Sequence, residues 1–309
     1  MTEEIINYYN IMRRNFPFII REKETILRIL SNKDNIIICR KDSNNGLIAV
    51  SVINHGTILL LCVDLEYRNQ GIGSGLLKES EDIIAGNGYN KITAGAGFDY
   101  IMPGVPLARS YYKAGSKGLC PYINNNAADF FTKRGYAHTC GCDFFDMKIS
   151  LKDFTENIYN TRDNTENIIY RWATPDDIDN ICECTDDAYQ DFTKYYKDNA
   201  LYSGCNNPGV LAAFYNNEAC GTLIVRTEDM DNDIGSFGCL TVKHAYQGKH
   251  IAINLIKTGT KYLKDAGLKE AFIGYTYSGL DYLYGQAGYK PWIYYMMAEK
   301  EIHGELWSI

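Results

Sequence analysis

The sequence lacks an apolar run long enough to cross a membrane. Its most apolar stretch, Ile58–Val63, has the length of a buried strand, whereas a membrane helix needs roughly 20 such residues. The N-terminal segment also lacks the apolar core of a secretion signal, because Glu3 and Glu4 are soon followed by Arg13 and Arg14. We therefore expect a cytoplasmic protein that does not act at a membrane.

An excess of positive charge is also missing. The net charge is −7, and residues 1–150 hold 17 of the 31 basic and 15 of the 38 acidic residues, which leaves 14 and 23 for residues 151–309. This balance is poorly suited to nucleic acid, whose phosphates require clustered cations. It suits a cationic or amine ligand better, although a solvated acidic face is the commoner meaning of extra carboxylates.

The cysteines form neither a disulfide framework nor a zinc motif. All ten are scattered through a chain without the small size or secretory context of a disulfide-rich domain. His138, Cys140 and Cys142 alternate along a predicted strand and share one face, but no second pair stands at a zinc-site spacing. We therefore predict buried thiols and no metal.

The chain does contain an internal sequence repeat. Its 309 residues, 46% hydrophobic and 22% charged, suit two soluble domains. The segment Val63–Gly73 aligns with Val242–Ala252, and Phe131–Tyr136 aligns with Tyr284–Tyr289 in the same order. Two alignments in one order predict a duplicated domain.

Both copies have the pattern of a mixed α/β domain. The expected boundaries are a first repeat at 1–150, a polar linker at 151–167 and a second repeat at 168–309. Apolar alternation between turn residues predicts strands at 35–39, 47–53, 57–63, 91–96, 142–149, 168–172, 210–215, 219–226, 237–242, 271–275 and 292–298. Helices are predicted after each glycine loop, to about 85 and 264, and at 127–133 and 281–286.

The segment Arg68–Gly73 follows an apolar strand and opens a helix. Its two glycines let the chain approach an anion closely, and the unpaired amides of the first helical turn point at that anion. The dinucleotide fingerprint requires a third glycine where Leu76 stands, and no Gly-Lys-Ser/Thr of a Walker loop follows. The loop is therefore predicted to bind a pyrophosphate.

These residues resemble the signature of the GNAT acetyltransferase superfamily, Gln/Arg-x-x-Gly-x-Gly/Ala after a strand-ending valine. The matching positions are Val63, Arg68–Gly73 and, in the family's later helix motif, Asn125, Ala128, Phe131, Gly135 and Tyr136. With the second copy the resemblance covers nearly the whole chain. It implies two tandem GNAT repeats, each with a mixed, mostly antiparallel sheet flanked by helices, and acetyl-CoA as the co-substrate.

The resemblance also implies which residues meet acetyl-CoA. In the family the strand before the loop splays from its neighbour, so backbone amides at Cys62, Val63 and Val242 would hold the pantetheine arm and the thioester carbonyl. The cofactor-binding residues implied in the first repeat are Val63, Arg68, Asn69, Gln70, Gly71, Ile72, Gly73, Ser74 and Asn125. Those implied in the second repeat are Val242, Gln247, Gly248, Ile251 and Ala252.

The two repeats diverge in complementary ways. The first keeps both loop glycines, but Phe131 stands where the family commonly has a tyrosine that protonates the departing thiolate. The second has Tyr284 there, but His250 replaces the first loop glycine and Ser278 replaces the asparagine. A β-carbon at 250 should weaken phosphate binding unless its conformation is helical and allowed. We therefore place the better cofactor site in the first repeat and the candidate acid, Tyr284, in the second.

No general base is distinguished by spacing. Asp64, Glu66 and His55 flank the first splayed strand, and Asp231 and Asp233 precede the second. Any of them could take a proton from the attacking ammonium, but each is more often a surface turn residue.

Cys62 is a second candidate catalytic residue, because it stands in the strand beside the expected thioester. Its thiol would accept the acetyl group before the amine does. The family normally transfers the acetyl group directly, which favours a buried strand residue.

The predicted reaction is attack of a primary amine on acetyl-CoA, which yields an amide and free CoA. The acceptor is an unidentified small molecule or peptide, and the acidic second half favours a cationic one. An insertion at 98–122, with Pro103–Pro106, either walls the acceptor pocket or packs against the second repeat. Two alternatives are a non-catalytic acyl-CoA-binding or regulatory protein, motivated by Phe131, and an aminoacyl-tRNA-dependent transferase, against which the missing basic stripe argues.

Overall fold

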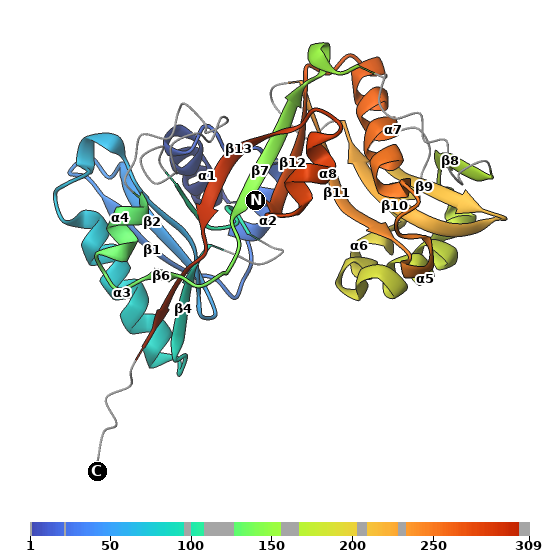
Figure 1. Ribbon diagram of the computed structural model, residues 1–309. Coiled ribbons are helices and arrows are strands. Elements are labelled where there is room, and N and C mark those ends of the chain that lie inside the picture. The colour runs from blue at the N-terminus through green and yellow to red at the C-terminus, as the bar shows by residue number, and fades with distance from the viewer. Residues whose placement is uncertain are drawn as a thin grey trace. The chain divides into compact units, whose positions relative to one another are not determined.

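The computed structural model describes residues 2–21, 23–95, 100–107, 127–155, 167–202, 209–227 and 233–302 (Figure 1). The chain forms two compact units. Unit 1 comprises residues 1–144 and 293–309, and unit 2 comprises residues 145–292. This division differs at both ends from the one expected at residues 150 and 168, because the end of each repeat belongs to the unit built mainly from the other repeat.

Unit 1 is built on one sheet with the strand order β1-β2-β3-β4-β14-β6. The bounds are β1 (Ile36–Lys41), β2 (Leu47–Asn54), β3 (Thr57–Val63), β4 (Lys91–Ala94), β14 (Ala298–Glu301) and β6 (Ala137–His138). Its helices are α1 (Glu3–Asn15), α2 (Lys23–Leu30), α3 (Ile72–Gly86) and α4 (Ala127–Thr132), with a 3-10 turn η1 (Leu65–Tyr67). Only the β3–β4 pair runs parallel among the pairings described for this sheet.

Helices α1 and α3 cover opposite faces of this sheet. The Cys62 thiol of β3 donates to the carbonyl of Ile11 in α1. In β2, Val50 pairs with Cys62, so the next residue, Ser51, points to the opposite face. Its hydroxyl shares a hydrogen bond with the Ser80 hydroxyl of α3, with 2.8 Å between the oxygens. Because successive strand residues point to opposite faces, the sheet separates an α1 side from an α3 side.

Unit 2 repeats the plan on a second sheet, whose strand order is β5-β13-β7-β12-β11-β10-β9-β8. Its strands are β5 (Val105–Pro106), β7 (Phe144–Ser150), β8 (Ile168–Trp172), β9 (Gly209–Tyr215), β10 (Glu218–Arg226), β11 (Ile234–Val242), β12 (Glu270–Tyr277) and β13 (Lys290–Met296). Its helices are α5 (Ile178–Tyr189), α6 (Thr193–Tyr196), α7 (Ile251–Asp265) and α8 (Leu280–Gly285). Short 3-10 turns are η3 (Leu151–Asp153), η4 (Pro175–Asp177), η5 (Gln190–Phe192), η6 (Asn199–Tyr202) and η7 (His244–Tyr246). The unit boundary falls within β13, so β5 and the end of β13 belong to unit 1.

The predicted duplication and fold class are confirmed. The run β1-β2-β3-η1-α3-β4 recurs as β9-β10-β11-η7-α7-β12, and in each run the strand before the helix is parallel to the strand after it. Both sheets are otherwise mostly antiparallel and flanked by helices, as expected for tandem repeats of this kind.

The last strand of each repeat joins the other repeat's sheet. The predicted strand at 142–149 is β7, which lies beside β12 in the second sheet and does not close the first one. Its place in unit 1 is taken by β14, which pairs with β4 and with β6. Two ion pairs hold β14 there, Lys91 with Glu299 and Lys300 with Glu81. An alternating strand fits any half-buried sheet position, so its sequence pattern does not say which sheet it joins.

The segments beside these strands pack as well. Leu151 and Phe154, at the start of the expected linker, are buried in unit 2, and residues 156–166 lie outside the described residues. In the predicted insertion, Val105 and Pro106 form β5 against Tyr295 and Met296, and residues 108–126 lie outside the described part.

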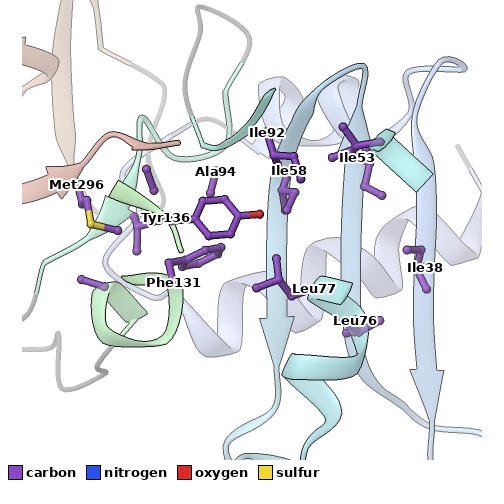
Figure 2. Close-up of a cluster of buried hydrophobic side chains, with 14 of the residues drawn as sticks. Ile38, Ile53, Ile58, Leu76, Leu77, Ile92, Ala94, Phe131, Tyr136 and Met296 are labelled. Carbon is purple, nitrogen blue, oxygen red and sulfur yellow. The ribbon is translucent and has the colours of Figure 1, made fainter. Parts of the chain in front are cut away.

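A buried cluster in unit 1 connects the helix after the loop with the later helix motif (Figure 2). Leu76 and Leu77 of α3 pack with Ile58 of β3, with Phe131 of α4 and with Met296 near the end of the chain. Helices α3 and α4 therefore share one core, and the C-terminal segment completes that core.

Candidate active site

The strand before each helix pairs with a parallel neighbour over its first residues only, and in unit 2 the two strands then separate. In unit 1 the described β3–β4 pairs end at Ile58, although β3 stays paired with β2 as far as Val63. In unit 2 the β11–β12 pairs end at Phe237, although β11 stays paired with β10 as far as Val242. In unit 2, where β12 continues to Tyr277, five residues of β11 thus leave the parallel neighbour, and their backbone groups on that side are open to a ligand.

A side chain from the loop braces the end of each strand that precedes a loop. The Arg68 Nε donates to the carbonyl of Val63 at 2.9 Å, and the Gln247 Nε2 donates to the carbonyl of Val242 at 3.4 Å. The Arg68 Nη2 also donates to the Asn15 Oδ1 at 2.9 Å. Both side chains were predicted to bind the cofactor. The contacts described here hold the shape of the loop, and a cofactor-binding role for the two side chains stays a prediction.

Both loops follow the same backbone path. Asn69 and Gly71 have φ of 61° and 84°, and the matching Gly248 and His250 have φ of 77° and 59°. Gly71 and His250 are the N-cap residues of α3 and α7, and neither helix has a side-chain cap hydrogen bond. The first-turn amides therefore lack the partner that a capping side chain gives, which leaves them free to bind an anion.

The residues of these loops fit the diphosphate of an acyl-CoA. A β-carbon added at Gly71 would meet nothing within 4 Å, so the space before the first-turn amides of α3 is open. His250 adopts the left-handed conformation that an L residue tolerates at a cost, and it is exposed. The second loop therefore keeps the backbone conformation of the first but adds an imidazole beside the first-turn amides, and the left-handed His250 is not in the helical conformation that was stated as the exception.

A cation that the sequence did not single out lies beside the first loop. The Arg134 Nη2 donates to the Ser74 Oγ in the first turn of α3 at 2.6 Å, and its Nη1 donates to the Phe130 carbonyl at 2.7 Å. Its guanidinium carbon lies 3.9 Å from the centre of the Phe130 ring. The signal was present in the aligned segment Phe131–Tyr136, but spacing alone does not show that the side chain turns back toward the loop.

Comparison with known proteins settles the family. A model described as the acetyltransferase (GNAT) family matches residues 6–115 and 168–281, more than half of the chain. The protein belongs to the GNAT family. No curated protein matches the chain.

Three solved structures show the same fold across the chain. The glucosamine N-acetyltransferase region of a fungal multi-domain GH3 β-N-acetylglucosaminidase is 18% identical with a TM-score of 0.72, and the match covers 96% of this chain but 37% of that one. A GCN5-related N-acetyltransferase from Sphaerobacter thermophilus is 17% identical with a TM-score of 0.64, covering 91% and 85%. A tandem GNAT protein from the clavulanic acid biosynthesis pathway is 11% identical with a TM-score of 0.68, covering 97% and 95%.

The position where the GNAT family commonly has a proton-donating tyrosine holds a different residue in each repeat, Phe131 in the first and Tyr284 in the second. Phe131 is buried in the unit 1 cluster and packs edge-on against Tyr136, with ring centres 5.1 Å apart. Burial and the nearby Glu81 carboxylate raise the pKa of Tyr136, whose hydroxyl has no hydrogen-bond partner among the described residues. Asn125, the other member of this motif, lies outside the described residues.

Tyr284 occupies the corresponding position of α8 in the second GNAT repeat. It is buried, and this burial, with Tyr277 and Cys239 nearby, raises its pKa well above the ordinary value. Cys239 belongs to the splayed part of β11, where its φ of 54° marks an irregularity in the strand. The tyrosine therefore stays protonated at neutral pH and lies next to the strand that the family uses for the thioester.

Cys62 is not placed as a GNAT nucleophile would be. Its side chain is buried on the α1 face and donates to the Ile11 carbonyl at 3.7 Å. Burial, and to a lesser extent Asp64, raises the pKa of the thiol to about 12. A nucleophilic cysteine needs an accessible thiolate, so the burial of Cys62 favours a structural role over the predicted catalytic one.

The substitution Cys62→Ala is therefore expected to leave kcat unchanged. It removes a buried sulfur and should lower the free energy of unfolding by about 1 kcal/mol. Steady-state kinetics and urea unfolding measure the two effects. Loss of turnover in a variant that still binds acetyl-CoA would restore the covalent mechanism.

The candidate bases near the first loop are engaged elsewhere. Burial alone would raise the pKa of Asp64, but hydrogen bonds from Arg14 and Asn15 outweigh it and lower the pKa. The His55 Nδ1 lies 3.0 Å from the Tyr89 hydroxyl in an exposed turn. Asp233 pairs with Lys269, and Asp231 lies outside the described residues. Asp64, His55 and Asp233 are therefore all engaged with other side chains.

A polar cavity of about 860 Å³ lies near the first loop but on the α1 side. Its lining includes Glu4, Tyr8, Arg14, Asp42 and Asp64. The open amides and α4 belong to the α3 side, so we do not assign acyl-CoA to this cavity.

Within the described ranges, no three His, Cys, Asp or Glu side chains are grouped as metal ligands. His138 accepts a hydrogen bond from the Met297 amide through its Nδ1. None of the described helices combines the length and apolar composition that crossing a membrane requires.

Proposed function

We propose that the protein transfers an acetyl group from acetyl-CoA to a primary amine. The observation that carries this proposal is the repeated arrangement of a parallel strand, a left-handed cap and an uncapped helical turn, with the strand splayed from its neighbour in the second repeat. The amides of the turn suit a diphosphate, and the free edge of the strand suits the amide-bearing pantetheine arm. Attack of the amine on the thioester carbonyl forms the amide bond and breaks the carbon–sulfur bond.

The two repeats share the work unequally in this proposal. The first loop binds acetyl-CoA more tightly, because Gly71 leaves the approach to the α3 amides open. The transfer itself belongs to the second repeat, because Tyr284 carries the hydroxyl that Phe131 lacks. Tyr284 gives its proton to the departing thiolate, and a raised pKa keeps that proton available at neutral pH.

The proposed acceptor is a cationic amine, supported by the 14 basic against 23 acidic residues in 151–309. Such an acceptor must lose one proton before it attacks. A panel of amines should include glucosamine, which is named for the similar fungal region, together with diamines and peptide N-termini. Release of CoA in the presence of one amine class tests the proposal.

Exchanging the two cap residues tests the assignment of the tighter site. Gly71→His places a side chain in the open space and is expected to weaken the tighter acetyl-CoA site about 10- to 100-fold, the equivalent of one or two charge-assisted hydrogen bonds. His250→Gly removes the corresponding obstacle and is expected to strengthen the weaker site. Titration calorimetry of the full chain resolves both sites.

Each exchange is the control for the other, because the two caps have the same conformation. If Gly71→His leaves the tighter site intact while His250→Gly alters it, the tighter site is in the second repeat. If the unmodified chain binds no acetyl-CoA, the proposed function itself fails.

A non-catalytic acyl-CoA-binding protein is the second candidate, favoured by the buried Phe131 in the repeat with the open loop. It predicts binding of acetyl-CoA without release of CoA across the amine panel. A single amine that supports multiple turnovers rejects it.

A further inference from the structure

Arg134 is held in one orientation by three contacts. One Nη group donates to the Phe130 carbonyl and the other to the Ser74 hydroxyl. The guanidinium plane is further held by the Phe130 ring beneath it. Two atoms at the edge of that ring in turn lie 3.6 and 3.7 Å from the point where Gly73 would carry a β-carbon. The Phe130 ring therefore packs against both the first turn of α3 and the Arg134 guanidinium.

These contacts leave part of the guanidinium unused. An arginine has five N–H donors, and the two hydrogen bonds account for two of them. Arg134 is half-buried, and no carboxylate pairs with it among the ion pairs described for unit 1. Three donors and a full positive charge thus remain beside amides that already favour an anion.

The second repeat has none of this assembly. By the alignment of the two repeats, Ile253 replaces Ser74, Ala287 replaces Arg134 and Leu283 replaces Phe130. The hydroxyl, the charge and the aromatic support are all replaced by apolar groups. The backbone of the two loops is preserved in conformation, so the loops differ in charge beside the first helical turn as well as in the side chain at the cap.

We propose that Arg134 binds the diphosphate of acyl-CoA in the first repeat and adds to the affinity difference that the cap residues Gly71 and His250 create between the two loops. This rests on the proposed function only in assuming that the first loop binds CoA. The diphosphate is favoured over the 3′-phosphate because Arg134 contacts Ser74, the third residue of the turn whose amides form the cradle. Because the Arg134 guanidinium is already held against the Phe130 ring, its N–H donors need no further ordering, which favours a bidentate contact with phosphate oxygens.

The test is the affinity of the full chain for CoA and for dephospho-CoA, which lacks the 3′-phosphate. Arg134→Gln is expected to weaken the tighter site about 10- to 100-fold for both ligands, as for the loss of a hydrogen-bonded charge. Raising the ionic strength should narrow the gap between variant and wild type, because salt screens the lost charge. Thermal unfolding shows that the variant is folded.

Lys133→Gln is the matched control, because Lys133 is the exposed neighbour and its loss changes the net charge equally. It is expected to leave both affinities close to wild type. Arg134→Lys keeps the positive charge but loses the planar set of paired N–H donors, and it should give an intermediate affinity.

Three results would overturn the proposal. A loss for CoA but not for dephospho-CoA would assign Arg134 to the 3′-phosphate. Equal losses for Lys133→Gln and Arg134→Gln would reduce the effect to general electrostatics, and a loss insensitive to salt, or no loss, would leave Arg134 a purely structural link between α4 and α3. If wild type binds CoA in each case, the proposed function survives while this assignment fails.

Discussion

Unit 1 is expected to unfold when the chain is cut after Trp292, although its N-terminal 144 residues remain. The cut removes β14, which lies between β4 and β6 in the sheet. It also removes the buried side chains of Met296 and Ala298 from the core. Loss of one buried methionine costs about 2–5 kcal/mol, and the lost strand pairing adds to that. The total approaches the whole stability of a typical domain, about 5–15 kcal/mol.

Hydrogen exchange read by mass spectrometry measures this effect unit by unit. Peptides from β1, β2 and β3 should lose protection, while peptides from β9 and β10 should keep it. A chain cut after Ile302 keeps β14 and serves as the control. Unchanged protection of β2 and β3 in the shorter chain would show that the C-terminal segment is dispensable. Because residues 1–150 alone lack β14, ligand-binding experiments require the full chain.

Tyr284→Phe is expected to lower kcat about 100-fold or more, within the range that a positioned acid contributes. The ring and its packing stay, and only the hydroxyl that protonates the thiolate is lost. Binding of acetyl-CoA at the tighter site should be unchanged, because that site is assigned to the first loop. Because the pKa of Tyr284 is raised, wild-type kcat should not fall in the alkaline range where free tyrosine ionises, near about 10.

Tyr289→Phe is the matched control for this variant. Tyr289 is also buried, its ring centre lies 6.5 Å from that of Tyr284, and its hydroxyl shares a hydrogen bond of 2.9 Å with Thr260. It should lose roughly 1 kcal/mol of stability and keep its kcat. Equal turnover in Tyr284→Phe and wild type, for an amine that the protein acetylates, would move the chemistry to the first repeat.

The local parts of the candidate site could be predicted from the sequence. Glycine at 71, an apolar strand before it and helical periodicity after it define the loop through interactions within about 20 residues. The loop of the second repeat has the same local structure, because His250 has the same left-handed conformation as Gly71. Backbone conformation of this kind depends on neighbouring residues, so a motif is enough to indicate it.

Contacts between distant segments could not be predicted in this way. The direction of the Cys62 side chain depends on which face of β3 α1 covers, and the position of Arg134 depends on how α4 packs against α3. Neither is encoded in the spacing of residues along a single element.

The sequence by itself therefore determined the repeated fold, the family and the matching positions of the two glycine-containing loops, because each follows from local periodicity and from the comparison of one half with the other. Only the tertiary structure decided which sheet receives each final strand, which thiol is buried and which cation lies beside the loop. Those outcomes depend on packing between residues far apart in the chain, such as Lys300 with Glu81. Alternating strands and amphipathic helices offer several equivalent partners, and the burial of side chains selects among them.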